Sequence, residues 1–137
     1  MALKVELKPG EKFILGDSVI VNDDQRTRLT IEGEAPILRE KDVMTIEAAD
    51  TPCKKIYLIV QLMYLSRDPV SHHKMYFDLV NDVVKAAPST LRFIDDINNH
   101  ILTGALYKAL KATKGLIEYE GTLLENASRG SSVRVDG

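Results

Sequence analysis

Several residue types that mark particular chemistry are scarce in this chain of 137 residues. It holds one cysteine, Cys53, so an internal disulfide bond is excluded, and this usage is typical of a reduced compartment. No basic-then-apolar signal pattern opens the sequence. The longest apolar run, residues 56–65, is interrupted by Gln61 and is too short to span a membrane. We therefore expect a cytoplasmic protein.

Motifs of catalysis and of metal or phosphate binding are also missing. Neither a GxxxxGK[ST] loop nor a GxGxxG loop occurs. Asp95 and Asp96 are adjacent acids, but no nucleophile, oxyanion site or phosphate loop accompanies them. His72 and His73 would point about 100° apart on a helix, and His100 completes no metal-ligand spacing with them. The sequence predicts a protein that is not an enzyme and that uses no metal or cofactor.

The chain has no excess of positive charge, because its formal net charge at pH 7 is −2. Residues 1–44 hold seven Lys or Arg against nine Asp or Glu, and the remainder holds eleven of each kind. Neutralised phosphates supply most of the affinity of a non-specific nucleic-acid binder. A general binder of this kind is therefore disfavoured, and any RNA contact has to come from a local basic patch.

The first 44 residues have the pattern of a small antiparallel β-unit. Residues 3–8 alternate between apolar and charged side chains, which is the period of a half-buried strand. Gly10-Glu11 and Gly16-Asp17 are turn dipeptides, and Gly33 to Pro36 break the chain again. Short strands are predicted between these breaks. Five such strands without a helix are marginally stable alone.

The apolar period changes to that of a helix after residue 50. Thr51 as N-cap and Pro52 at the first helical position predict a helix that ends near Ser66. Asp68-Pro69, a Ser89 cap and a Gly104 stop predict three more helices. They run over residues 69–87, 90–103 and 105–125.

The first helix, residues 52–66, has almost no polar face. We expect it to be buried on nearly every side, Leu62 included, in the core or in a subunit interface. Residues 126–137 are small and polar, so they are predicted to be disordered. The predicted fold class is α+β. A five-stranded antiparallel β-unit over residues 1–44 precedes an antiparallel bundle of about four helices over residues 51–125.

The order of Gly10-Glu11, Gly16-Asp17, Ala35-Pro36 and Arg39-Glu40 resembles the carbon storage regulators, small bacterial proteins that bind messenger RNA leaders. The segments at residues 1–11, 22–29 and 97–104 look like the FlbT family of flagellum biosynthesis repressors. This second resemblance covers roughly residues 1 to 125. It implies a post-transcriptional regulator that associates with the 5′ untranslated region of flagellin mRNA and promotes its degradation or blocks its translation. It also favours a homodimer whose short strands are paired between subunits.

The resemblance to carbon storage regulators implies which residues contact RNA. In that family, basic residues on the first and last strands of two different subunits lie side by side and grip an RNA loop. Lys8 and Arg39 stand at those positions, with Val5 and Leu38 as flanking apolar contacts. Leu7 departs from the pattern, because those proteins usually carry a second basic residue there.

Arg26 and Arg28 lie two residues apart in the same region. They either widen the basic patch or pair with Asp23 and Asp24, as surface charges commonly do.

The competing class of function is a protein adaptor. Under this alternative, the helices from Asp68 onward bind flagellin or another helical flagellar protein, such as a chaperone, in an apolar groove. RNA effects would then be indirect. Three lysines, at residues 108, 111 and 114, are either a solvated face or a surface for RNA or an acidic partner. Asn98, Asn99 and His100 are candidates for hydrogen bonds to a neighbouring helix or a protein partner.

Overall fold

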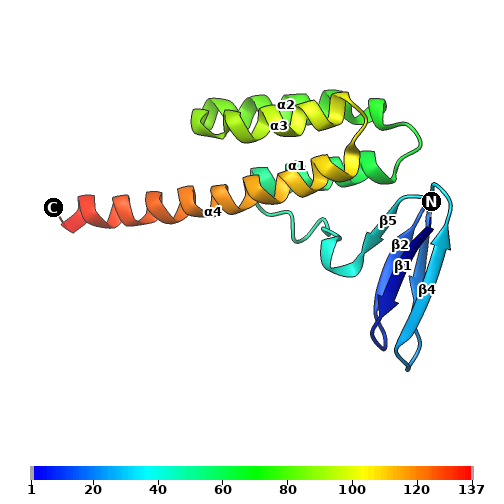
Figure 1. The fold of residues 1–137 in the computed structure, drawn as a ribbon. Helices are drawn as coiled ribbons and strands as arrows, with labels where there is room; N and C mark the ends of the chain where they lie inside the picture. The colour runs from blue at the N-terminus through cyan, green and yellow to red at the C-terminus, as the bar shows by residue number, and fades with distance from the viewer. Residues whose placement is uncertain (1, 137) are drawn as a thin grey trace. The chain divides into compact units, whose positions relative to one another are not determined.

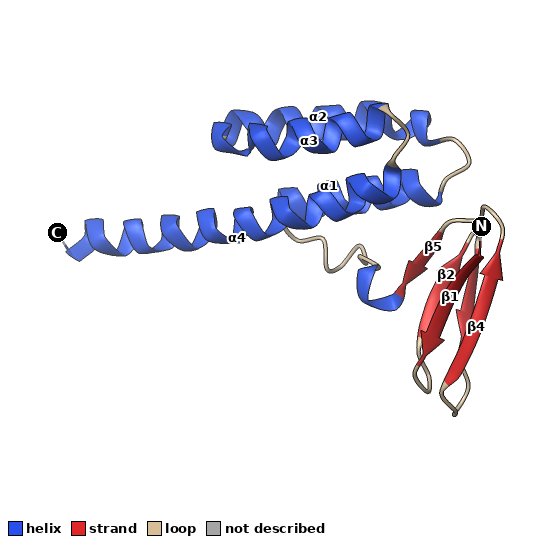
Figure 2. Ribbon diagram, in the orientation of Figure 1, coloured by secondary structure: helices blue, strands red, loops and turns tan. Residues whose placement is uncertain are grey.

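The computed structural model describes residues 2–136, with side chains described as far as Arg129, in two compact units that divide between Val43 and Met44. The first unit is made of strands and the second of helices (Figure 1, Figure 2). The predicted α+β class is therefore confirmed.

Five short strands form two antiparallel sheets in the first unit. β1 pairs with β4 in one sheet, and the order of the other sheet is β3-β2-β5. The strands are β1 (Ala2–Leu7), β2 (Lys12–Leu15), β3 (Ser18–Val21), β4 (Thr27–Glu32) and β5 (Ile37–Arg39), and a 3₁₀ turn, η1 (Glu40–Asp42), follows them. Positive φ angles at Gly10 (74°) and Gly16 (62°) allow the two turns that flank β2.

The core of the β-unit follows from strand alternation. Val5 and Leu7 point to the same face of β1 and are buried, and Phe13 of β2 joins them. Partly buried apolar residues of the other strands pack against this cluster; they are Leu15, Ile20, Leu29, Ile31 and Ile37. The contacts join residues far apart in the sequence, so the two sheets depend on one another.

Four helices form the second unit: α1 (Pro52–Leu65), α2 (His73–Ala86), α3 (Leu91–Leu102) and α4 (Leu106–Asp136). Two 3₁₀ turns, η2 (Pro69–His72) and η3 (Pro88–Thr90), precede α2 and α3. α2 and α3 lie in one layer and α1 and α4 in the other (Figure 1). Buried side chains from all four helices fill the space between them; the largest include Ile56, Met63, Tyr76, Ile94, Ile97, Leu110 and Leu116. None of the described helices is long and apolar enough to cross a membrane.

Two of the predicted helix boundaries are confirmed by their hydrogen bonds. The Thr51 hydroxyl accepts the Lys54 N–H at 3.2 Å, as an N-cap does. Gly104 has a φ of 77° and ends α3, because its N–H donates to the Ile101 carbonyl and the next N–H donates to that of His100. This pattern is a Schellman motif.

The predicted caps of α2 and α3 are wrong. The Asp68 side chain makes no capping hydrogen bond, and a 3₁₀ turn intervenes before α2. Ser89 lies inside η3, and its hydroxyl accepts a hydrogen bond from Tyr119 at 2.6 Å. Pro69 and Pro88 thus start 3₁₀ turns, and the α-helices begin only after these turns.

Two further expectations differ from the structure. Leu62, predicted to be buried in the core or in a subunit interface, is 43% exposed in the single chain, so α1 has one side that its own chain does not cover. The backbone of α4 is helical through Asp136, past Glu125, where the fourth helix was expected to end. The disorder predicted for the segment of residues 126–137 stays a prediction.

Two buried polar side chains connect α1 to the rest of its unit. The Glu120 carboxylate accepts hydrogen bonds from the Thr51 hydroxyl and, at 3.0 Å, from the Cys53 N–H. A negative charge there is favourable at the amino end of a helix. At the middle of α1, the Gln61 side-chain amide accepts from the Met44 N–H at 2.7 Å and donates to the Met44 carbonyl at 3.0 Å. Neither role was apparent from local sequence.

The same carboxylate acts on the one cysteine. Burial, together with the neighbouring charge of Glu120, raises the pKa of Cys53 to about 12. The thiol is therefore protonated at neutral pH, and Cys53 behaves as a small core residue.

Glu120→Ala should lower the free energy of unfolding by about 1–3 kcal/mol, because it leaves the buried Cys53 N–H and the partly buried Thr51 hydroxyl without their acceptor. Urea denaturation followed by circular dichroism measures this change. Glu118→Ala, at an exposed position of the same helix, is the control and should cost less than about 0.5 kcal/mol. Equal losses for the two variants would show that Glu120 does not anchor α1.

Candidate functional site

Arg39, the last residue of β5, reaches from one sheet of the β-unit to the other. Its Nη2 donates to the backbone carbonyl of Glu6 in β1 at 2.9 Å and to Oε2 of Glu11 at 3.3 Å. Its Nε is buried without a hydrogen-bond partner. The side chain as a whole is still 40% exposed.

Glu11 joins Arg39 to Lys8. Its Oε1 accepts the Lys8 N–H at 2.9 Å, while its Oε2 contacts Arg39. The hydrogen bond from the Lys8 N–H, followed by the contact with the guanidinium, lowers the pKa of Glu11. Within one chain, the Lys8 backbone and the Arg39 side chain thus contact the same carboxylate. The resemblance to carbon storage regulators implies that the two basic side chains meet across two subunits, and this stays a prediction.

Asn22 holds the turn beneath this cluster and was not singled out from the sequence. Its side-chain amide donates to the carbonyls of Lys8 at 2.7 Å and of Gln25 at 2.8 Å. The turn that follows β1 is thereby tied to the turn that precedes β4. The signal was the polar run at residues 22–25, because asparagine commonly bonds to nearby backbone groups in turns.

The other predicted RNA-contacting residues fall into two groups. Arg26 pairs with Glu6 at 3.4 Å, instead of with Asp23 or Asp24, and Arg28 is exposed opposite Glu6 in the β1–β4 register. Val5 and Leu38 are 3% and 0% exposed. These two side chains therefore support the strands that carry Lys8 and Arg39, and they offer no surface of their own.

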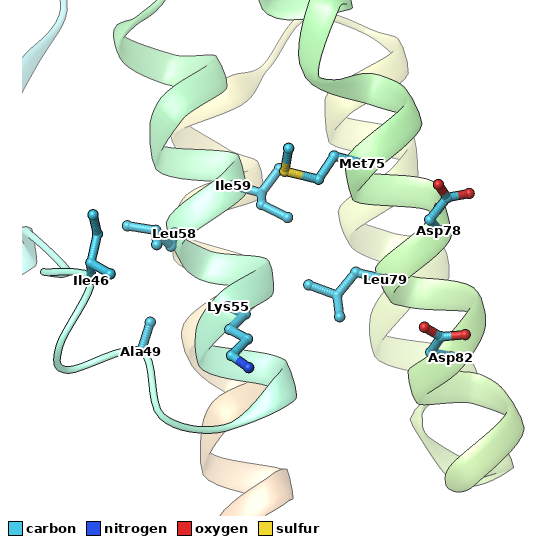
Figure 3. Close-up of a pocket in the computed structure, with 9 residues that line it drawn as sticks. All are labelled: Ile46, Ala49, Lys55, Leu58, Ile59, Met75, Asp78, Leu79 and Asp82. Atoms are coloured by element: carbon cyan, nitrogen blue, oxygen red, sulfur yellow. The ribbon is translucent and has the colours of Figure 1, made fainter.

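The helical unit contains an apolar groove between α1, α2 and the segment before α1 (Figure 3). Its volume is about 490 Å³. Ile46 and Met75 line it and are 77% and 59% exposed. The remaining lining residues are Ala49, Lys55, Leu58, Ile59, Asp78, Leu79 and Asp82. The groove thus has an apolar floor and a rim with both signs of charge.

The remaining polar candidates have mainly structural contacts. Asn98 accepts a hydrogen bond from the Tyr76 hydroxyl at 2.6 Å, which confirms that it bonds to a neighbouring helix. His100 lies 3.6 Å from Asp96, and the ring of His73 packs edge-on against Phe77. Within residues 2–136, no cluster of three or more histidines, cysteines and acids is placed to hold a metal ion.

The three lysines at residues 108, 111 and 114, which the sequence suggests as a solvated face or a binding surface, lie on an exposed face of α4. The Lys111 ammonium is 5.2 Å from the centre of the Tyr107 ring, and that ring packs against Tyr64.

These features define a small α+β protein with a cluster of paired arginines and glutamates on the β-unit and an apolar groove on the helical unit. The sequence profile described as "Flagellar protein FlbT" matches residues 3–124. The chain belongs to the FlbT family.

Individual relatives agree with this assignment. The chain is 59% identical over 124 residues to "Probable flagellum biosynthesis repressor protein FlbT 1" of Bradyrhizobium diazoefficiens, covering 90% of this chain and 85% of the relative. It is 49% identical to the "Probable flagellum biosynthesis repressor protein FlbT" of Rhodopseudomonas palustris, covering 90% and 98%. It is 38% identical to the "Flagellum biosynthesis repressor protein FlbT" of Caulobacter vibrioides, covering 99% of both. No solved structure matches the chain significantly.

Asn22→Ala should destabilise the β-unit by about 1–2 kcal/mol, because the carbonyls of Lys8 and Gln25 lose their side-chain donor. Hydrogen exchange of the β1 and β4 amides measures the loss as faster exchange. Asp24→Ala, an exposed change in the same turn, should leave these rates nearly unchanged. Unaltered protection in Asn22→Ala would mean that backbone bonds alone hold the two turns.

Proposed function

We propose that the protein is a post-transcriptional regulator of flagellum biogenesis. It associates with the 5′ untranslated region of flagellin mRNA and promotes its degradation or blocks its translation. Membership of the FlbT family, whose members named above are described as flagellum biosynthesis repressors, supports the flagellar role. The observation that carries the RNA contact is the position of Glu11, whose carboxylate accepts the Lys8 backbone N–H and pairs with the Arg39 guanidinium.

The geometry supports contact with a single strand of RNA. Specific recognition of RNA favours unpaired bases that are splayed out and contacted by basic or aromatic side chains. Lys8 is exposed, its backbone N–H bonds to the carboxylate that also holds Arg39, and Arg28 is an exposed cation on β4. A planar guanidinium can stack on a base while it donates hydrogen bonds, whereas an ammonium acts mainly as a point charge. Arg39 is therefore the principal contact, with Lys8 beside it.

We also propose that the protein is a homodimer. β1 and β4 form a sheet of only two strands, and β3 and β5 are the edges of the other sheet. Exposed edges of short strands are available for pairing with another chain. Pairing of these edges across a two-fold axis would duplicate the RNA-contacting residues. Light scattering at tens of micromolar should give twice the monomer mass, and a folded monomer would contradict the proposal.

Arg39→Ala should weaken binding of a flagellin leader RNA by roughly 1–3 kcal/mol, and Lys8→Ala should weaken it less. Fluorescence anisotropy with purified full-length protein measures both losses. Arg67→Ala removes an exposed arginine in the helical unit and serves as the charge-matched control. Because Arg39 also bonds to Glu6 and Glu11, its variant should be checked for folding by circular dichroism.

Lys8→Ala avoids this complication, since its ammonium is exposed and only its backbone is used in the turn. Wild-type affinity in a folded Lys8→Ala, Arg39→Ala double variant would contradict the RNA contact at this edge. Equal affinity of the wild-type protein for the leader and for a scrambled RNA would contradict specific recognition.

The apolar groove favours a second candidate function, that of an adaptor for a helical flagellar protein such as flagellin or a chaperone. Grooves of this size and character commonly hold the apolar face of an amphipathic helix. Ile46 and Met75 expose apolar surface there, and methionine adapts readily to varied partners. Salt distinguishes the two candidates, because RNA binding should weaken steeply as salt rises and apolar binding should not.

Met75→Glu should abolish binding of flagellin in a pull-down or calorimetric assay, because it places a charge in the apolar groove. The protein should stay folded, since Met75 is already 59% exposed. Val70→Glu is the matched control, because Val70 is 66% exposed and does not line the groove. Unchanged flagellin binding by Met75→Glu, or a failure of the wild-type protein to bind it, would argue against the adaptor function.

A further inference from the structure

We propose that Glu11 is a specificity-determining residue of the RNA-contacting edge. Its carboxylate repels the phosphates of any RNA, so that an RNA contacted only through its phosphates binds weakly. This inference rests on the proposed RNA contact, and it concerns how that contact selects its ligand.

The carboxylate occupies the position that a phosphate would take on Arg39. The hydrogen bonds from the guanidinium to Glu6 and Glu11 are both donated by Nη2, and Nε is enclosed. Arginine binds a phosphate most strongly by donating two parallel hydrogen bonds from neighbouring nitrogens. In Arg39, pairs of donors that include Nε or Nη2 are therefore not available. A phosphate gains a fork that includes Nη2 only if Glu11 moves.

Glu11 is held in this position. Its side chain is 19% exposed, and Oε1 is bound by the Lys8 N–H at 2.9 Å. Other acids of the edge are engaged elsewhere: Glu6 pairs with Arg26, and Glu40 accepts the Lys12 N–H at 3.2 Å. Within the described part of the chain, the carboxylate in ion-pair contact with Arg39 is that of Glu11. Its lowered pKa keeps it ionised at neutral pH.

A fixed negative charge at this place penalises different ligands unequally. Non-specific RNA binding depends on phosphates, so a like charge beside the main cation removes much of its driving force. A specific strand also makes base contacts, which the carboxylate does not weaken. Discrimination built on such a repulsive element is a common way to exclude wrong partners. An acidic β-unit can in this way recognise one RNA without binding RNA in general.

The test is Glu11→Gln in the full-length protein. Glutamine keeps an oxygen that can accept the Lys8 N–H, while the negative charge next to Arg39 is lost. Affinities for a flagellin leader RNA and for a scrambled RNA are measured by anisotropy at several salt concentrations. We expect the scrambled RNA to bind about three- to tenfold more tightly and the leader to change less, so that the specificity ratio falls about threefold or more. The salt dependence for the scrambled RNA should become steeper.

Two controls separate local from global charge. Glu34→Gln makes the same change of net charge at an exposed position of the same unit, and it should alter both affinities slightly and equally. Glu11→Gln introduced into Arg39→Ala should have little further effect, because the repulsion acts where Arg39 attracts the phosphate.

An unchanged specificity ratio, an equal effect of Glu34→Gln, or a loss of affinity for both RNAs would overturn the inference. The last result would mean that Glu11 only positions Arg39. In each of these cases, wild-type preference for the leader would leave the proposed function standing. A wild-type protein that does not prefer the leader would overturn the proposed function and the inference with it.

Discussion

Burial of α1 is the constraint on which the helical unit depends. The helix is apolar on nearly every side, so it is stable in water only when other segments cover it. α4 covers one side and is fastened there by Glu120, α2 covers another, and the segment before α1 is held to it by Gln61. The chain leaves one side incompletely covered. Leu58 and Ile59 contribute that side to the groove, so the candidate docking surface is a consequence of how α1 is packed.

In the β-unit, the corresponding constraint is electrostatic. The unit carries more acidic than basic residues, yet its cations are grouped near one end of β1. Glu6 and Glu11 make this possible. The Glu6 carboxylate pairs with Arg26 while the Glu6 carbonyl accepts a hydrogen bond from Arg39. The Glu11 carboxylate binds Arg39 with one oxygen and the Lys8 N–H with the other. The arrangement concentrates positive charge where RNA contact is proposed and reduces the general attraction for phosphates. A local basic edge is thereby compatible with a net negative protein.

The two candidate surfaces have different physical characters and belong to different units. Contact at the β-edge relies on charge and hydrogen bonds, which salt screens, whereas the groove relies on the burial of apolar surface. Each can be altered by single exposed substitutions that leave the other intact. A regulator that senses a flagellar protein and acts on an RNA would use both, and the two sets of variants would separate these activities in one protein.

The sequence by itself determined the order of the elements, since alternation, the 3.6-residue period, the Thr51 cap and the Gly104 stop are all local signals. It also placed Asn98 on a helix face that bonds to a neighbour. Only the tertiary structure decided which strands pair, that Glu120 and Gln61 anchor α1, and that Leu62 is exposed. It also decided that Arg39 reaches Glu6 and Glu11. These features join residues far apart in the chain, and the choice among many such partners depends on packing that no local pattern encodes.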